Sequence, residues 1–95
     1  MELPQTPPNP INETRENRLK RMQMRSMRRG IKEMDILLSA FAEAHLADMN
    51  EADLQTYDAL LHENDQDLYQ WVTGQKEAPE TFRSMIEKVS QTFDT

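Results

Sequence analysis

The stretch EMDILLSAFAEAHLA, residues 33–47, decides the fold, because its apolar side chains recur at every third or fourth position. That spacing places them on one face of an α-helix. Negative charge is favoured in the first turn of a helix, and Glu33 and Asp35 supply it. We therefore predict a helix over 33–47 at the centre of the core, with an apolar stripe of Met34, Leu37, Leu38, Phe41, His45 and Leu46.

The rest of the chain is predicted to be helical too. Between 11 and 93 the only glycines and prolines are Gly30, Gly74 and Pro79, and no segment alternates apolar and polar residues over the length of a strand. We expect a first helix from a cap at Asn12 to about Arg29. Another helix is predicted to be opened by Asn50 and Asp53 and ended by Asn64 and Asp65. A short helix should follow over about 67–73, and a last one should begin at Pro79. Their inward side chains are predicted to be Leu54, Tyr57, Leu60, Leu61, Leu68, Trp71, Val72, Phe82, Met85, Ile86 and Val89, whereas Tyr69 lies off the stripe and should be more exposed than Trp71. The predicted fold class is all-α, a small five-helix bundle.

Length and composition bound the function. A chain of 95 residues makes one domain, and 37% hydrophobic with 29% charged residues is typical of a soluble globular protein. No apolar run approaches the roughly 18 residues that a membrane span needs, so we expect no membrane insertion. The absence of cysteine excludes disulfides and thiolate chemistry.

The first residues differ in composition from the remainder. Four of the five prolines and a single charged residue lie within 1–11, a composition that cannot propagate a helix. It has neither the basic start and apolar stretch of a signal peptide nor the arginines of an organelle transit peptide. We predict a disordered arm at 1–11, a single helical domain at 12–93, and a bacterial cytoplasmic location.

The charge of the chain changes sign close to Gly30. Residues 12–32 carry eight Lys or Arg against two Glu, whereas residues 33–80 carry twelve Asp or Glu against one Lys, within a net charge of −6. If the backbone is helical through Gly30, Arg29 and Glu33 flank a position without a side chain, where a partner could approach closely. If Gly30 ends a helix, the two charges stabilise two helix dipoles instead. A glycine inside a helix costs about 1 kcal/mol relative to alanine, so local physics favours the helix stop.

Catalytic chemistry is not indicated by the sequence. Asp65 and Asp67 resemble helix caps more than a paired acid and base. His45 lies on the apolar stripe, where we expect a half-buried histidine bonded to a neighbour, and with His62 it cannot form a zinc site unaided. Two glycines 44 positions apart cannot build a phosphate-binding loop. We therefore predict that the protein is not an enzyme and holds no metal.

A basic stripe offers an alternative function. In a continuous helix Arg15, Arg18, Arg25, Arg29 and Lys32 would gather along one side and could follow the phosphates of a nucleic acid. The net charge of −6 and the lack of aromatic residues among the arginines oppose this interpretation. The same stripe in residues 15–32 could serve another interaction module or be only a solvated helix face.

Five blocks in order resemble a known family. They are Arg28-Arg29-Gly30-Ile31-Lys32-Glu33-Met34-Asp35, Ala44-His45-Leu46, Tyr57-Asp58-x-Leu60-Leu61, Asp67-Leu68-Tyr69-x-Trp71 and Ala78-Pro79-Glu80. Over about 18–89 the chain is similar to the SdhE family, the succinate dehydrogenase assembly factor 2 proteins of bacteria and mitochondria. It departs from many relatives at Gln66, where they have proline.

This resemblance implies a five-helix protein that is not itself an enzyme. Family members bind the flavoprotein subunit of succinate dehydrogenase, and of fumarate reductase where present, and promote covalent attachment of FAD to it. The resemblance implies that Arg29, Gly30 and Glu33 contact the flavoprotein, and we add Arg28 and Asp35 to this predicted partner-binding set. We expect a chaperone-like mechanism, a monomer when free, no stably bound cofactor and no nucleic-acid partner.

Overall fold

The computed structural model describes residues 13–93, which are helical apart from short connections. Within this range the helices are α1 (Arg15–Arg25), α2 (Lys32–His45), the short 3-10 helix η1 (Leu46–Asp48), α3 (Glu51–Leu60), α4 (Asp65–Val72) and α5 (Glu80–Phe93). The predicted all-α class and its five α-helices are confirmed. No helix in the described part of the chain has the length and apolarity to cross a membrane. The predicted arm at 1–11 and the predicted cap Asn12 lie outside the described residues.

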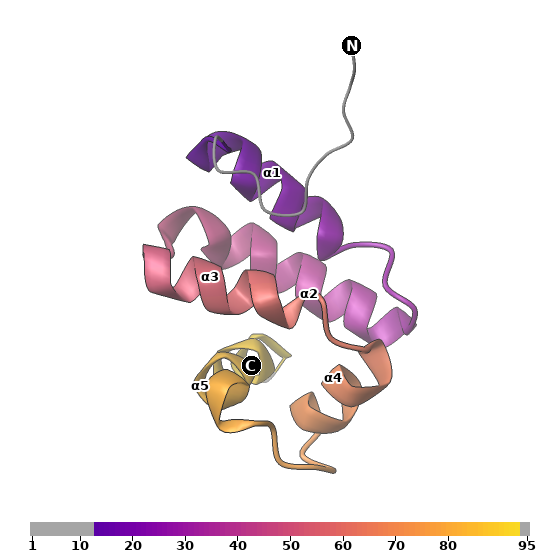
Figure 1. Cartoon of the computed structure of the whole chain (residues 1–95). Coiled ribbons are helices and arrows are strands. Elements are labelled where there is room, and N and C mark those ends of the chain that lie inside the picture. Colours follow the sequence, from indigo (N-terminus) through magenta and orange to yellow (C-terminus); the bar gives the residue numbers. More distant parts are fainter. Residues whose placement is uncertain (1–12, 94–95) are drawn as a thin grey trace.

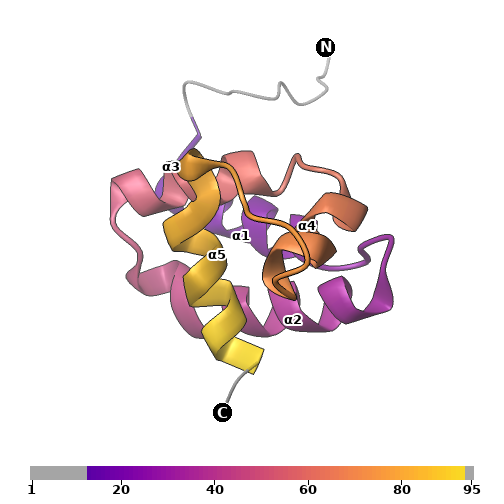
Figure 2. The same cartoon turned by 90° about the horizontal axis from the view of Figure 1, so that it is seen from below.

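The helices stack in three levels (Figure 1). α2 and α3 form the middle level, α1 lies above them, and α4 and α5 lie below. α5 packs on α2, α3 and α4, and α1 packs on α2 and η1. The view from below shows α5 crossing the space between α2 and α3 (Figure 2). This arrangement leaves the connection from α1 to α2 at one corner, beside α4.

The core lies between these levels and is centred on α2, as the sequence predicted. Its buried apolar residues are Met22, Met34, Leu37, Leu38, Phe41, Ala42, Leu46, Met49, Leu54, Tyr57, Leu60, Leu61, Leu68, Ala78, Phe82, Met85, Ile86 and Val89. The ring of Phe41 on α2 meets that of Tyr57 on α3, with 5.3 Å between centroids. Leu54, Leu68 and Val89 show that each of the later helices contributes an inward face.

One of three aromatic side chains near the core, that of His45, differs from its prediction. His45 is exposed, its ring against that of Phe41 at 4.9 Å, so its predicted half-buried position is wrong. It is the last residue of α2, and the neighbouring Leu46 is buried in its place. Tyr69 and Trp71 are both partly buried against the core, and the ring centroid of Trp71 lies 6.0 Å from that of Phe82.

Asparagine caps fix the starts of α3 and α4. The side chain of Asn50 accepts a hydrogen bond from the Asp53 amide at 2.7 Å, which confirms the predicted cap. Asn64 was expected to end α3, but it caps α4, accepting from the Gln66 amide at 2.7 Å. α4 therefore begins at Asp65, two positions before the predicted start. It ends before Gly74, whose φ of 82° suits the predicted stop.

The first helix is shorter than predicted. It is capped by Thr14, whose hydroxyl accepts from the Asn17 amide at 3.1 Å, and it ends at Arg25 rather than at about Arg29. The predicted stop at Gly30 is wrong, because the helix has ended before that residue is reached. Ser26, directly after the last turn, is fully buried, and the chain then returns to the surface at Met27 and Arg28.

Candidate functional site

The α1–α2 loop, residues 26–31, contains most of the predicted partner-binding residues. It lies at the corner of the molecule where α3 ends and α4 begins. Side chains from three helices, α2, α3 and α4, bind it through hydrogen bonds. The loop therefore has a defined conformation although much of it is exposed.

Ser26 anchors the start of the loop in the core. Its hydroxyl donates to the Met22 carbonyl at 2.8 Å and lies 2.7 Å from the Tyr57 hydroxyl of α3. The Ser39 hydroxyl of α2 donates to the Ser26 carbonyl at 3.3 Å. Burial raises the pKa of Tyr57 to about 12, so its phenol is neutral over the physiological range and remains a hydrogen-bonding group. The first residue of the loop is thus fixed by both middle helices.

Arg28 carries the unusual backbone angle of the loop. Its φ is 56°, in the left-handed region that residues other than glycine seldom adopt. The Arg28 amide donates to Asp35 Oδ1 at 3.0 Å, which compensates part of this strain. The Arg28 side chain is exposed, whereas Asp35 is partly buried. Asp35 therefore shapes the loop, and Arg28 presents a charge to solvent.

Arg29 is directed into the molecule. Its side chain is only 9% exposed, and its Nε donates to Asp65 Oδ1 at 2.7 Å. Nη1 donates to the carbonyls of Arg25 at 2.7 Å and Leu61 at 3.2 Å, and Nη2 to that of Glu63 at 3.4 Å. The Arg25 and Leu61 carbonyls lie where α1 and α3 end, so the guanidinium meets the negative ends of two helix dipoles. One buried cation therefore joins α1, α3 and α4.

Gly30 is needed for close approach rather than for a turn. Its amide donates to Asp65 Oδ2 at 2.6 Å, and a Cβ at this position would lie 3.1 Å from the same oxygen. Its φ is not in the positive range, unlike that of Gly74. Neither proposed role, in the middle of a helix or as a helix stop, is correct. The absence of a side chain lets the backbone touch the Asp65 carboxylate.

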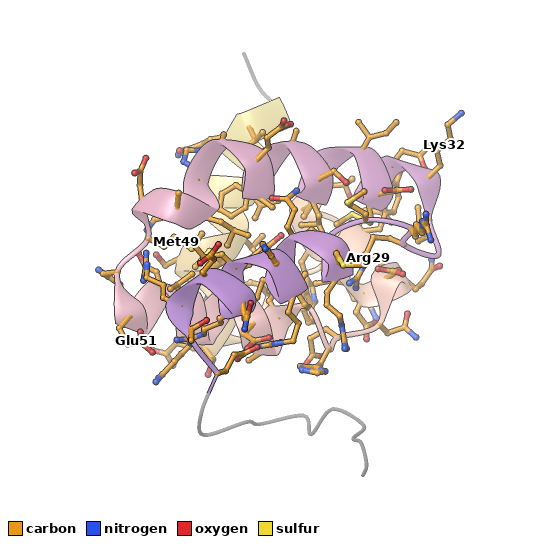
Figure 3. All side chains as sticks on the ribbon, turned by 90° about the horizontal axis from the view of Figure 1, so that it is seen from above. Arg29, Lys32, Met49 and Glu51 are labelled. Carbon is orange, nitrogen blue, oxygen red and sulfur yellow. The ribbon has the colours of Figure 1, made fainter. Side chains whose placement is uncertain are left out.

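Glu33 and Lys32 lie just beyond the loop, in the first turn of α2, and both are exposed. Figure 3 shows Lys32 projecting from the end of α2, while Arg29 lies over the body of the protein. The structure brings together all the residues predicted to bind a partner, but they divide into two groups. Arg28, Gly30 and Glu33 are exposed, whereas Arg29 and Asp35 are occupied inside the protein.

The basic stripe does not exist as a continuous line. α1 ends at Arg25, and Arg15 donates to the carbonyls of Ala47 and Met49 at 3.2 and 3.0 Å. Arg18 pairs with Glu51 at 2.6 Å, and this ion pair lowers the pKa of the glutamate. Met49 and Glu51 lie at the opposite end of α1 from Arg29 in Figure 3. These arginines serve the fold, which disfavours the alternative function of following phosphates.

Two further residues bind Arg21, which had no predicted role. Arg21 donates to Glu13 at 2.7 and 3.1 Å and to Asp58 at 3.0 and 2.8 Å. Hydrogen bonding to the guanidinium holds the pKa of Asp58 below its usual range. This network ties α1 to α3. It is a structural contact, not an acid and base pair placed for catalysis.

Other parts of the described surface offer less. No group of three or more His, Asp or Glu within residues 13–93 is placed to hold a metal ion. A hollow of about 490 Å³ between α2, α3 and α5 is lined by Phe41, His45, Asp53 and Lys88, among others. Lys88 and Asp53 pair with each other at 3.2 Å across its rim. Two of its charged groups are therefore already paired with each other.

Asp65 and Ser26 are the residues that sequence reasoning missed. Asp65 was interpreted as a helix cap, yet Asn64 performs that role and the Asp65 carboxylate faces the loop. Gly30 and Asp65 are 35 positions apart, so no local pattern could connect them. Ser26 lies in a basic run that suggests an exposed surface, and only its position four residues after Met22, on the same face of a helix, indicates burial.

Comparison with known proteins relates the chain to one family. The family model described as "Flavinator of succinate dehydrogenase" matches residues 20–93. A succinate dehydrogenase assembly factor 2 of Aspergillus terreus is 54% identical over 56 residues, covering 59% of this chain and 18% of the relative. The Candida glabrata protein of the same name is 55% identical over 49 residues, covering 52% and 32%.

A third such protein, from Schizosaccharomyces japonicus, is 46% identical over 56 residues, covering 59% of this chain and 39% of the relative. All three relatives carry the description mitochondrial. The matched part spans between 18% and 39% of their length. The family model matches the chain from the middle of α1 to the end of α5. The chain therefore belongs to the Sdh5 family, the flavinators of succinate dehydrogenase.

Proposed function

We propose that this protein is an assembly factor that binds the flavoprotein subunit of succinate dehydrogenase and promotes covalent attachment of FAD to that subunit. Family membership and the names of the relatives support the proposal. We extend it to the flavoprotein of fumarate reductase in hosts that make one. The family is one of assembly factors rather than enzymes, and FAD is expected to remain with the partner.

The docking surface in this proposal is the corner formed by the α1–α2 loop and the first turn of α2. It presents Arg28, the bare backbone at Gly30, and Glu33, with Lys32 beside them. Arg29 and Asp35 belong to the same surface by holding its shape. The observation that carries the proposal is that an exposed loop is bound by side chains of three helices. A surface fixed in advance loses less conformational entropy when it binds.

The mechanism requires binding and no chemistry by this chain. A protein that binds one conformation of its partner more tightly shifts the partner toward that conformation. Bound at this corner, the factor would favour the arrangement of the immature flavoprotein in which FAD meets its acceptor side chain. The mixed charges of Arg28, Lys32 and Glu33 would set the orientation of encounter more than the affinity.

The test is covalent flavin in the flavoprotein subunit, produced in cells that lack an endogenous factor. Flavin fluorescence of the denatured subunit should appear with the wild-type chain and fall about tenfold with Glu33→Ala or Arg28→Ala, given the contribution of charged hydrogen bonds at interfaces. Glu87→Ala, a change at another exposed position, on α5, is the matched control and should leave the signal intact. Equal fluorescence with and without the wild-type chain would refute the function.

A second measurement isolates the surface. Binding of the purified chain to the flavoprotein lacking covalent flavin should weaken for the Glu33 and Arg28 variants and not for the Glu87 variant. If all variants bind equally while the wild type supports flavin attachment, the function stands and the docking corner is elsewhere.

A further inference from the structure

Asp65, a residue of α4, is placed to fix the shape of the proposed docking corner. Each carboxylate oxygen has a separate partner in the α1–α2 loop: Oδ1 accepts from Arg29 Nε at 2.7 Å, and Oδ2 accepts from the Gly30 amide at 2.6 Å. One side chain thus holds both a side chain and the backbone of consecutive loop residues. Hydrogen bonds to an ionised carboxylate are among the strongest in proteins.

The helix itself does not need this carboxylate. Asn64 is the cap of α4 and accepts from the Gln66 amide, so the cap hydrogen bond is made without Asp65. Asp67 lies in the same first turn and is exposed. The two aspartates therefore bring the same charge to the same helix end, but only Asp65 reaches the loop.

The loop would change shape without Asp65, while the fold would remain. Arg29 would keep its carbonyl partners Arg25, Leu61 and Glu63, which join α1 to α3. The Gly30 amide, in contrast, is exposed and bonds to Asp65. Removing the carboxylate would release the backbone between Arg28 and Ile31, where the bare surface of Gly30 is presented.

We propose that Asp65 is a positioning residue for partner docking: its carboxylate clamps Arg29 and the Gly30 amide, so that the loop is held in the shape that the flavoprotein recognises. This inference rests on the proposed function. It assigns Arg29 to the same clamp, so that the partner contacts Gly30 and its exposed neighbours rather than the Arg29 guanidinium.

Nuclear magnetic resonance can observe the clamp directly, because the chain has only two glycines and their amide nitrogens resonate apart from most others. In the full chain, the Gly30 amide proton should appear far downfield, as a short bond to a carboxylate requires. It should move upfield in Asp65→Asn and further in Asp65→Ala, and stay in place in the control Asp67→Asn. The Gly74 amide is an internal reference. An unmoved Gly30 signal in Asp65→Ala would show that the clamp is absent.

Docking is then measured with the same variants and the flavoprotein that lacks covalent flavin. Affinity should fall by about tenfold or more in Asp65→Ala, less in Asp65→Asn, and not in Asp67→Asn. Across the variants, the loss of affinity should correlate with the change in the Gly30 chemical shift. A merely structural role for Asp65 would instead make the loss of affinity correlate with the fall in melting temperature. If the Asp65 variants lose the Gly30 signature yet dock like the wild type, the positioning role is wrong. If the wild-type chain itself does not bind the flavoprotein, the proposed function is wrong, and Asp65 then has no docking role either.

Discussion

The hydroxyl oxygens of Ser26 and Tyr57 lie 2.7 Å apart inside the core, where Ser26 has no exposed surface. The pair joins the first residue of the loop that carries Arg29 to helix α3. Polar groups in such a place stabilise a fold only while they remain paired, because an unpaired buried hydroxyl loses its hydration without compensation.

Removing the Tyr57 hydroxyl should therefore destabilise the protein. Tyr57→Phe leaves Ser26 with the Met22 carbonyl as its remaining partner, and we expect a loss of about 1–2 kcal/mol in the free energy of unfolding. Urea titration followed by circular dichroism measures it. Tyr69→Phe, at a partly buried tyrosine on α4, is the control and should cost less. Equal stability of the wild type and Tyr57→Phe would show that this hydrogen bond contributes nothing.

Gly30→Ala should destabilise the protein through Asp65. The new methyl group would lie 3.1 Å from Asp65 Oδ2, a tight contact that requires the carboxylate to shift slightly within its short bonds. We expect a loss of about 1 kcal/mol in wild type and a smaller loss in the Asp65→Ala background, since contacting residues couple by roughly 0.5–3 kcal/mol. Unfolding free energies of the two single variants and the double variant complete the cycle. If the two losses of unfolding free energy simply add in the double variant, the new methyl group does not clash with Asp65.

Arg29→Lys should not be a conservative change. An ammonium group cannot reproduce the planar fork that reaches Asp65 and the carbonyls of Arg25 and Leu61 together. The variant should lose about 1–3 kcal/mol of unfolding free energy, as expected when buried charged hydrogen bonds are left unmade. Arg28→Lys, at an exposed position, is the matched comparison and should change stability little. Thermal or urea unfolding of both variants decides, and similar losses in both would contradict the buried role of Arg29.

Arg28→Gly should weaken docking without lowering the free energy of unfolding. The left-handed φ of 56° costs an L-residue about 1–2 kcal/mol, and glycine avoids this cost. Glycine also makes the unfolded chain more flexible, at about 0.4–1 kcal/mol, so unfolding free energy should stay level or rise slightly. Docking to the flavoprotein should weaken, because an exposed cation is lost. A clear loss of stability in urea would mean that the Arg28 side chain supports the fold.

The sequence predicted those parts of this protein that depend on near neighbours. The stripe of α2 is periodic, and Asn50 lies three residues before Asp53, so the helix and the cap were both recognisable. The loop was not predictable in the same way. The contact between Gly30 and Asp65 spans 35 positions, and it exists only because α4 folds back beside the end of α1. Sequence reasoning placed Arg29 in the partner-binding set for the same reason, since its acceptors at the end of α3 and on α4 are 32 and 36 positions away.

Acid should weaken the protein through the Arg21 network. The hydrogen bond from Arg21 holds the pKa of Asp58 below its usual value of 3.8, so the ionised carboxylate is favoured in the folded state. Its contribution is fully present above the pKa of the unfolded chain and is lost as pH falls through the lower pKa of the folded state. In that window the unfolded chain binds more protons, and unfolding free energy must fall as pH falls.

Urea titrations at steps from about pH 7 down to about pH 3 should show this decline for the wild type and a shallower one for Asp58→Asn, which has no proton to bind at this site. Asp67→Asn removes an exposed carboxylate from α4 and should keep the steep decline. Because the Asp58 variant leaves Arg21 with Glu13 as its carboxylate partner, it should also be less stable at neutral pH. Parallel curves for Asp58→Asn and the wild type would mean that Asp58 titrates alike in both states and that Arg21 contributes no pH-dependent stability through it.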